Sequence, residues 1–404
     1  MPVRHVAALA LLLVMENALA AAPATTAATR LAQDAVIVDT HIDAPTELLA
    51  EWQDLGELTP NREFDYPRAR QGGLDVAFMS IYTSPQEDQL GTARAIAHRQ
   101  IDAVEAMVGR HPGKFALLAS PGDVERLRAD NHVLLALGME NGAPLGDDLA
   151  QLAKFHARGV RYITLAHSAS NRISDSSYDR NRQWQGLSPF GKQVVAEMNR
   201  LGIMVDVSHL SDAAVKQAVE LSSVPVIASH SGFRHFTPGF ERNLSDELAK
   251  AIAARGGVVQ ITFGIGFVNR KAADDLQAYF SAEAAIDERN AAARAAGKPL
   301  EDKDAFDKEW KRTHPAPATP IEAVLDQVDY AAKLIGIDHV GLGSDFDGVS
   351  GNLPAGLHSV ADYPNLIAGL QARGYKDDDL KKFLGGNLLR VWAAVEAGSE
   401  QPNR

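Results

Sequence analysis

The sequence predicts an α/β protein built as a (β/α)8 TIM barrel, and three observations lead to this fold class. Short apolar runs alternate with longer helical segments along 404 residues, a length that accommodates one barrel with insertions. Eight such runs are apolar on both faces, as strands of a helix-covered parallel sheet are. Six of the eight end in a histidine or a carboxylate. An open doubly wound sheet is the runner-up, but no glycine-rich dinucleotide loop follows the first strand.

The expected strands are short and are separated by helix signals. Ser211 caps a helix that ends near Ser222, and Ser245 caps one that Gly256 stops. A third helical pattern covers Ser188–Gly202. The eight expected strands are Val36–Asp39, Val76–Ile81, Val133–Leu137, Tyr162–Leu165, Ile203–Val207, Val224–Ala228, Val258–Phe263 and Val340–Gly343.

Two segments exceed a minimal barrel. The stretch between Tyr82 and Val133 holds extra material that includes the motif FALLAS. Val268–Pro320 is rich in alanine, lysine and acidic residues and predicts a helical insertion between strands seven and eight. Its composition leaves three roles open for the insertion: a lid, a dimer contact or a solvated excursion.

The N-terminus has the pattern of a secretory signal peptide. Val6–Val14 is apolar but too short to cross a bilayer, and Ala18-Leu19-Ala20 resembles a cleavage site. We therefore expect a signal peptide over residues 1–20, a flexible spacer over 21–33, one barrel domain over 34–404, and a periplasmic or secreted protein. The polar ending SEQPNR carries no lipid-anchor signal, so no membrane anchor is expected.

Composition excludes several functional classes. The formal net charge is -12 and no basic patch is evident, which argues against nucleic acid as a partner. The chain has no cysteine, so disulfides, thiolate zinc sites and cysteine nucleophiles are excluded. Any metal site must therefore use imidazole and carboxylate groups.

Such groups gather at the expected strand ends. In a barrel, the carboxyl ends of all strands converge on the face that carries the active site, so these residues would surround one pocket. They are His41 and Asp43 after the first strand, Glu140 after the third, His167 after the fourth, His209 after the fifth, His230 after the sixth and Asp345 after the eighth.

These residue types are typical of a metal-dependent hydrolase. Imidazole with carboxylate suits zinc, manganese or iron, and zinc is the commonest choice for hydrolysis. His41 and Asp43 lie on one side of an extended segment, so both can reach one ion. His209 and His230 follow adjacent strands and can reach a second ion.

Glu140 and Asp345 complete this chemistry. Glu140 lies between the two pairs in strand order and could bridge two ions. Two neighbouring ions stabilise a bridging hydroxide and polarise a carbonyl. Asp345 is placed to accept the proton of that water and to pass it to a leaving group.

Over roughly Asp34–Val395 the chain resembles the membrane dipeptidase (renal dipeptidase) family of the amidohydrolase superfamily. His-x-Asp alone is not specific, but the matching motifs occur together and in the family's order. They are VDTHIDAP, GGLDVAFMSIY, ALGMENG, YITLAHSASN, DVSHLSD, PVIASHSG, RNLSDEL, GLGSDFDG and FLGGNLLRVW. The resemblance implies hydrolysis of dipeptides, including some with a D-residue at the C-terminal position, by a hydroxide that bridges two zinc ions. It also implies a homodimer.

The resemblance implies a role for each residue. His167 is expected to bind the substrate carbonyl and its oxyanion, and Arg242 to bind the C-terminal carboxylate through its guanidinium fork. Asp345 corresponds to the catalytic acid and base. The implied ligands are His41, Asp43 and Glu140 for one zinc ion, and Glu140, His209 and His230 for the other.

Two features depart from the mammalian members. The segment QITFGIGFVNR after strand seven lacks their substrate-contacting tyrosine, so the side-chain preference stays open. The Val268–Pro320 insertion looks longer, and the cysteines of their disulfides are absent. Asp39, two residues before His41, has no assigned role: it supports the site from behind or caps the polar edge of the barrel.

The alternative function is another amidohydrolase-type reaction, of the deaminase or lactonase kind. Single-metal deaminases use His-x-His on the first strand, where this chain has His-x-Asp. Phosphotriesterase-like members often carry a carboxylated lysine on the fourth strand, which here ends in His167. A binding protein without activity is a third hypothesis, but such proteins usually lose a ligand or the acid/base residue, and both are present here.

Overall fold

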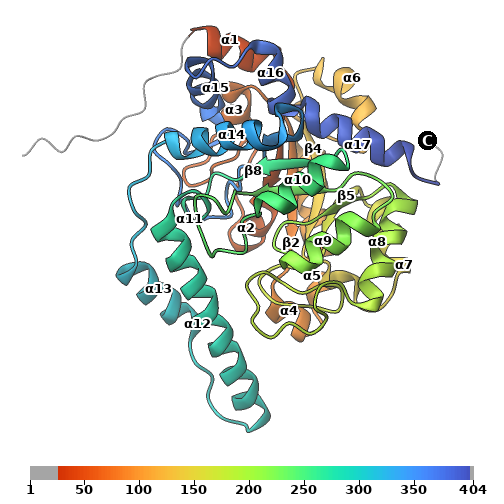
Figure 1. Ribbon diagram of the computed structural model, residues 1–404, viewed down its shortest axis with the longest axis vertical. Helices are drawn as coiled ribbons and strands as arrows, with labels where there is room; N and C mark the ends of the chain where they lie inside the picture. Colours follow the sequence, from red (N-terminus) through yellow and green to blue (C-terminus); the bar gives the residue numbers. More distant parts are fainter. Residues whose placement is uncertain (1–25, 401–404) are drawn as a thin grey trace, which may run out of the picture.

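The computed structural model describes residues 26–400 as a parallel β-barrel surrounded by helices (Figure 1). Hydrogen bonds join eight strands in the order β1-β2-β4-β5-β6-β7-β8-β9, and a short β3 pairs with the start of β4. The strands are β1 (Ile37–Ile42), β2 (Leu74–Tyr82), β3 (Phe115–Leu117), β4 (Val133–Glu140), β5 (Val160–Thr164), β6 (Met204–Asp206), β7 (Ile227–Ser231), β8 (Val258–Ile261) and β9 (Val340–Leu342).

The sheet is nearly closed, because the chain beyond β9 pairs with the end of β1. The Asp43 amide donates to Phe346 O at 2.9 Å, and the Asp345 amide donates to His41 O at 3.1 Å. The predicted (β/α)8 fold class is therefore confirmed, with all eight expected strands present. The sequence analysis missed β3, which lies within the FALLAS motif.

Several strand boundaries differ from the sequence prediction, and two of these differences concern histidines of the site. β1 continues to Ile42, so His41 lies within the strand. β7 begins three residues later than expected and contains His230. The late start follows Pro225, whose nitrogen cannot donate to a sheet ladder.

Helices follow the strands and cover the outside of the barrel. Ser211 and Ser245 cap α9 and α10 as predicted, and Ser188 caps α8. Each accepts a hydrogen bond from a backbone amide three residues on. The helices are α1 (Thr26–Asp34), α2 (Ala44–Ala50), α3 (Tyr66–Gly72), α4 (Pro85–Gln89), α5 (Ala93–Arg110), α6 (Val124–Arg128), α7 (Ala150–Ala157), α8 (Pro189–Leu201), α9 (Asp212–Leu221), α10 (Asp246–Ala254), α11 (Ile265–Val268), α12 (Arg270–Ala295), α13 (Lys303–Thr313), α14 (Glu322–Ile335), α15 (Tyr363–Ala372), α16 (Asp377–Lys381) and α17 (Asn387–Ala397). Short turns are η1 (Pro121–Asp123), η2 (Ala143–Leu145), η3 (Ile337–His339), η4 (Val360–Asp362) and the π-helical η5 (Lys382–Gly386).

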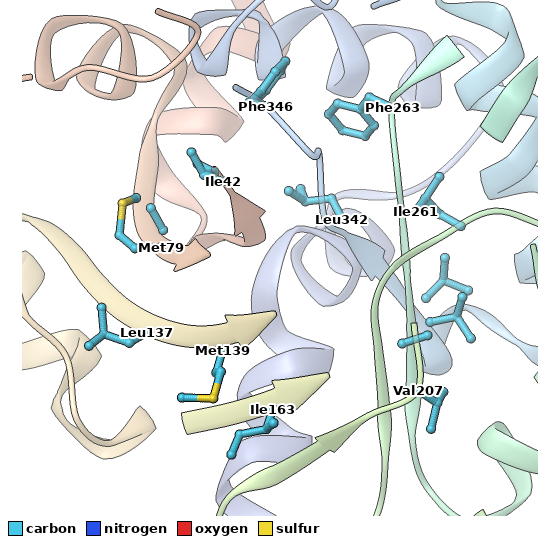
Figure 2. Packing of buried hydrophobic residues seen from close by; sticks show 14 of the residues in the cluster. Ile42, Met79, Leu137, Met139, Ile163, Val207, Ile261, Phe263, Leu342 and Phe346 are labelled. Atoms are coloured by element: carbon cyan, nitrogen blue, oxygen red, sulfur yellow. The ribbon is translucent and has the colours of Figure 1, made fainter. Parts of the chain in front are cut away.

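Alternation along the strands builds two cores. Outward side chains such as Met79, Leu137 and Ile163 pack beneath the helices (Figure 2). Inward side chains such as Phe78 and Tyr162 form a second cluster with Trp392 of α17 at the amino ends of the strands. The amino end of the barrel is thus filled with apolar groups, and the carboxyl end is left for polar ones.

The insertion before the last strand is helical, as predicted. α12 has 26 residues and extends about 39 Å away from the barrel, with α13 beside it (Figure 1). The described part of α13 has no buried residue, and Ala273 near the start of α12 is buried. The insertion therefore joins the barrel through the first part of α12.

The structure corrects the predicted spacer. Residues 26–33 belong to α1, whose Ala28, Leu31 and Ala32 are buried against the helices that cover the barrel. Burial of this apolar face orders a segment that composition alone marks as flexible. The predicted signal peptide over residues 1–20 lies outside the described residues. Between residues 26 and 400, no helix combines the length and apolarity needed to cross a membrane.

Candidate metal centre

Four imidazoles converge on the carboxylate of Glu140, the last residue of β4. Glu140 Oε1 lies 3.0 Å from His209 Nε2 and 3.3 Å from His230 Nε2, and these two nitrogens are 2.9 Å apart. Glu140 Oε2 lies 3.4 Å from His41 Nε2. His167 Nε2 lies 3.5 Å from Oε1. One oxygen of Glu140 thus faces each side of the cluster, which is the arrangement of a bridging ligand.

Two further carboxylates complete the His41 side. Asp43 Oδ2 lies 3.5 Å from His41 Nε2, and the ligand atoms of His41, Asp43 and Asp345 lie within 4.8 Å of one another. Every residue that the sequence analysis placed at the strand ends therefore meets in one cluster. We call it the Glu140 centre; it comprises His41, Asp43, Glu140, His167, His209, His230 and Asp345.

Register shifts aim two of these histidines at the centre. Val38 and Ile227 belong to the inner cluster, so strict alternation would turn His41 and His230 outward. The β1–β2 register shifts between Asp39 and Ile42, and the β7–β8 register shifts between Ala228 and Ser231. Such irregularities re-aim side chains next to active sites.

The sharp turns after two strands require unusual backbone conformations. His209 and Asp345 have φ of 69° and 68°, in the left-handed region that residues other than glycine rarely adopt. Asn141, directly after Glu140, has φ of 78°. Left-handed residues gathered beside one cluster are typical of functional sites.

Hydrogen bonds behind the centre orient His41. The Tyr162 hydroxyl donates to Thr40 O at 3.0 Å and lies 2.8 Å from His41 Nδ1, so it accepts the Nδ1 proton. His41 Nε2 then faces the carboxylates as a free ligand atom, and it is buried without a hydrogen-bond partner among residues 26–400. Gly138 makes room for this contact, because a Cβ there would lie 2.0 Å from the Tyr162 ring.

His230 is oriented in the same way. Ser229 Oγ donates to Asp206 Oδ2 at 2.6 Å and lies 2.8 Å from His230 Nδ1. His230 therefore donates through Nδ1 and presents Nε2 to Glu140. Metal-binding histidines are usually held by such a contact on the other ring nitrogen.

Asp39 supports the site from behind, which answers the question that the sequence left open. Its Oδ1 accepts from the His41 amide at 3.0 Å and from the Ser344 amide at 2.9 Å. Its Oδ2 accepts from the Tyr363 hydroxyl at 2.5 Å. The buried carboxylate thus ties the segment that carries His41 to the turn that carries Asp345.

The pKa values of His41 and Glu140 show that this side of the centre stabilises positive charge. Burial alone would lower the pKa of His41, but the carboxylates of Glu140 and Asp43 raise it to about 10. Burial opposes ionisation of Glu140 too, yet His41 and His167 hold its pKa well below the ordinary value. His41 holds a proton because the surrounding carboxylates attract positive charge. A divalent ion can replace that proton.

The opposite side of the centre favours neutral imidazoles. Burial lowers the pKa of His167 to about 4 and lowers the pKa of His209 and of His230 well below the ordinary value. Neutral imidazole is the form that binds metal ions. Burial raises the pKa of Asp345, which suits a group that must carry a proton. The residues present therefore fit divalent metal ions.

Arg242 lies beside the centre without a carboxylate partner. It is 3 % exposed, and its guanidinium donates to Ser231 Oγ at 3.0 Å and to His230 O at 2.8 Å. Its Nε is buried without a hydrogen-bond partner, and among residues 26–400 it forms no ion pair. An unpaired buried charge is costly, so this arginine is suited to an anionic ligand.

Several residues of the site were missed by the sequence analysis. Ser80 Oγ donates to Glu140 Oε2 at 3.2 Å, and Tyr82 lies edge-on to His167 with ring centroids 4.7 Å apart. Alternation along the motif GGLDVAFMSIY could have found both, because Ser80 and Tyr82 share the inner face of β2 with Phe78. Tyr162 and Ser229 carry no such signal, since their role depends on a neighbouring strand.

Comparison with known proteins agrees with this geometry. The family model described as membrane dipeptidase (peptidase family M19) matches residues 25–404. The dipeptidase aclJ of Aspergillus oryzae is 32% identical over 83% of this chain and 70% of its own length. Dipeptidase 3 of Mus musculus is 31% identical over 92% of this chain and 66% of its own length.

Solved structures of similar proteins share the fold. The probable dipeptidase PvdM from Pseudomonas aeruginosa is 29% identical with a TM-score of 0.79, covering 92% of this chain and 98% of its own. A metallo peptidase from Rhodobacter sphaeroides, liganded with a phosphinate mimic of the dipeptide L-Ala-D-Ala, is 25% identical with a TM-score of 0.72. That similarity covers 89% of this chain and 99% of the other.

Proposed function

Since this chain belongs to the membrane dipeptidase family, peptidase family M19, we propose that it is a dipeptidase that works with two zinc ions at the Glu140 centre. The observation that carries the proposal is the position of Glu140: its Oε2 faces one set of ligands, His41 with Asp43, and its Oε1 faces another, His209 with His230. A single carboxylate between two such sets favours a dinuclear site over a single-ion site.

Each ion would be held by three residues of this chain. The proposed ligands are His41, Asp43 and Glu140 for one ion, and Glu140, His209 and His230 for the other. Bound there, two zinc ions would lower the pKa of a water molecule and polarise the scissile carbonyl. Imidazole and carboxylate also suit manganese and iron, so the choice of zinc rests on its prevalence in hydrolytic sites.

Arg242 and His167 orient the substrate in this proposal. The free α-carboxylate of a dipeptide docks on Arg242, whose guanidinium is otherwise buried without a countercharge. The substrate carbonyl lies near His167, which is neutral and able to donate one hydrogen bond to the developing oxyanion. A peptide without a free carboxylate leaves Arg242 uncompensated, so C-terminal amides are rejected.

Asp345 moves the proton. It accepts a proton from the attacking water and delivers it to the departing amine, which completes cleavage of the amide bond. Its position beside His41 and Asp43 supports this role, as does the pKa of Asp345, which burial raises above the ordinary value.

We extend the proposal to dipeptides with a D-residue at the C-terminal position. The Rhodobacter sphaeroides structure holds a mimic of L-Ala-D-Ala. If Arg242 and His167 contact only the carboxylate and the carbonyl, they do not discriminate between the L and D configurations of the C-terminal residue. We also propose export to the periplasm or the medium, on the signal-peptide pattern of residues 1–20.

A dipeptide screen with metal analysis tests the proposal. We expect metal-loaded protein to hydrolyse L,L-dipeptides and some L,D-dipeptides, to reject their C-terminal amides, and to lose activity on chelation. The protein should contain two metal ions per chain, and Glu140→Ala should deplete them. Absence of turnover by folded, metal-loaded protein would refute the proposed function and favour another amidohydrolase-type reaction.

A further inference from the structure

Tyr178, in the loop between β5 and α8, lines the Glu140 centre. Its ring centroid is 6.0 Å from that of His209. Burial raises the pKa of its hydroxyl, and the charges of Arg242, Asp345 and Glu140 all act on it. Among residues 26–400 this hydroxyl has no hydrogen-bond partner. Tyr178 therefore faces the region where the substrate's carboxylate would lie.

The backbone around Tyr178 is hydrogen-bonded to the turn that carries His209. The Ser177 amide donates to His209 O at 2.8 Å, and Ser176 pairs with Leu210 in an isolated bridge. Asp175, which is fully buried, accepts hydrogen bonds from the backbone amides of three later residues of the same loop. The position of the Tyr178 ring is thus defined relative to His209 without help from its own side chain.

Other aromatic side chains extend this surface around Arg242. The Tyr178 ring lies 5.9 Å from Phe240 and 4.3 Å from Phe280. The Arg242 guanidinium lies 5.0 Å from the centre of the Phe267 ring, which also contacts Phe240. The buried cation therefore lies at the edge of a mostly apolar wall.

Phe280 belongs to α12, so the insertion takes part in this wall. The loop after β5 meets α12 again where Arg180 donates to Ser281 Oγ at 3.4 Å and Asn181 donates to Glu288 Oε1 at 3.2 Å. Nearer the barrel, Ala273 of α12 belongs to the same buried cluster as Phe240 and Phe267. One side of α12 is therefore packed onto the rim of the site, whereas Tyr279, beside Phe280, contacts α13.

We propose that Tyr178 and Phe240 form the subsite that receives the side chain of the substrate's C-terminal residue, that Phe280 of α12 positions the Tyr178 ring, and that α12 thereby sets a preference for large apolar side chains there. This inference rests on the proposed docking of the α-carboxylate on Arg242. The side chain branches from the carbon next to that carboxylate, so it must lie close to Arg242, where these rings are. Burial of apolar side-chain area against aromatic rings favours leucine or phenylalanine over glycine at that position.

The test compares two dipeptide series with the metal-loaded full chain. One series varies the C-terminal residue (Ala-Gly, Ala-Leu, Ala-Phe), and the other varies the N-terminal residue (Gly-Ala, Leu-Ala, Phe-Ala). We expect Tyr178→Ala to lower the kcat/KM ratio of Ala-Leu to Ala-Gly by about 10-fold or more. The kcat/KM ratio of Leu-Ala to Gly-Ala should change by less than about twofold. Tyr178→Phe keeps the ring and should keep the ratio.

Phe280 acts through Tyr178 and is tested as a positioning residue. Phe280→Ala should lower the same ratio by about 3- to 10-fold, and Phe280→Leu should restore most of it. Adding Phe280→Ala to Tyr178→Ala should change little, because the two rings form one contact. Trp310→Ala of α13 is the control: its ring packs on Tyr279, Phe306 and His314, so its loss should leave the ratio unchanged.

Three results would overturn the inference while leaving the proposed function intact. They are equal losses for Ala-Gly and Ala-Leu in Tyr178→Ala, a change confined to the N-terminal series, and loss of the ratio in Tyr178→Phe. If wild-type protein hydrolyses neither series, the proposed function itself fails and the inference fails with it.

Discussion

The two ends of the barrel are built from the same strands and differ in almost every other respect. At the amino end, inward side chains such as Phe78 pack on Trp392 of α17 in a buried apolar cluster. At the carboxyl end, a few residues further along, charged and polar groups are buried instead, and His209 and Asp345 take left-handed backbone conformations. We call the amino end, which apolar side chains fill, the closed end. We call the carboxyl end, which carries the polar groups of the Glu140 centre, the open end.

The difference shows how a strained site can persist in a stable protein. Buried charges and left-handed residues each cost free energy, and the packed end offsets that cost through apolar burial. Tyr162 belongs to both ends, because its ring lies in the apolar cluster and its hydroxyl reaches His41. Substitutions at the open end should therefore change activity, and substitutions at the closed end should change stability.

The largest expected effect is at Asp345. Asp345→Asn removes the group that carries the proton but keeps its size, so we expect kcat to fall by about 1,000-fold or more, at the upper end of what one acid/base group supplies. Steady-state kinetics on one dipeptide measure this loss. The zinc content and the urea midpoint should stay at the wild-type values, and retention of most activity would remove Asp345 from the mechanism.

At the closed end, Trp392→Ala should have the converse effect. The side chain is fully buried, so its loss leaves a cavity and should lower the free energy of unfolding by about 3–5 kcal/mol. Urea denaturation measures the change. Below the unfolding transition, kcat/KM per folded molecule should remain within about twofold of wild type; a large fall would show that the two ends are coupled.

Near the open end, Glu63 should make the free energy of unfolding depend on pH. Its carboxylate accepts from the Asp347 amide at 2.5 Å, two residues beyond Asp345, and burial raises the pKa of Glu63 from 4.5 to about 8. The unfolded chain then loses this proton near pH 4.5 and the folded protein only near pH 8. Stability is complete below the lower value and is lost as the pH rises through the upper one.

Glu63→Gln should remove this pH dependence. Across the window from pH 5 to pH 8.5, the wild-type free energy of unfolding should fall by about 4 kcal/mol more than that of the variant. Urea denaturation of both metal-free proteins at the two pH values measures the difference. Parallel curves would show that the Glu63 carboxyl is ionised in the folded protein.

The smallest expected effect is at the residue that joins the two ends. Tyr162→Phe keeps the ring in the apolar cluster and removes only the hydroxyl that holds His41 Nδ1. Loss of such an orienting contact should weaken zinc affinity by about 10-fold. Competition with a chromogenic chelator measures it, with Tyr363→Phe as a second variant that removes a hydroxyl from Asp39 instead. Unchanged zinc affinity in Tyr162→Phe would show that the tyrosine contributes only to apolar packing at the closed end.

Much of this architecture could be predicted because it depends on local pattern. The periodicity of apolar residues located all eight barrel strands, and the polar residues at six of the strand ends identified the members of the Glu140 centre. A parallel barrel gathers the carboxyl ends of its strands on one face, so sequence order alone was sufficient to bring Glu140 near residues more than 60 positions away.

By itself, then, the sequence determined the fold class and which residues share the site, because both follow from periodicity and strand order. The tertiary structure decided which way they point. His41 and His230 turn inward only because the strand register shifts beside them, and Arg242 is recognised as unpaired only when its surroundings are known. The contact of Tyr178 with Phe280 joins segments about 100 residues apart. Such features depend on neighbours that are distant in sequence, and no local pattern encodes them.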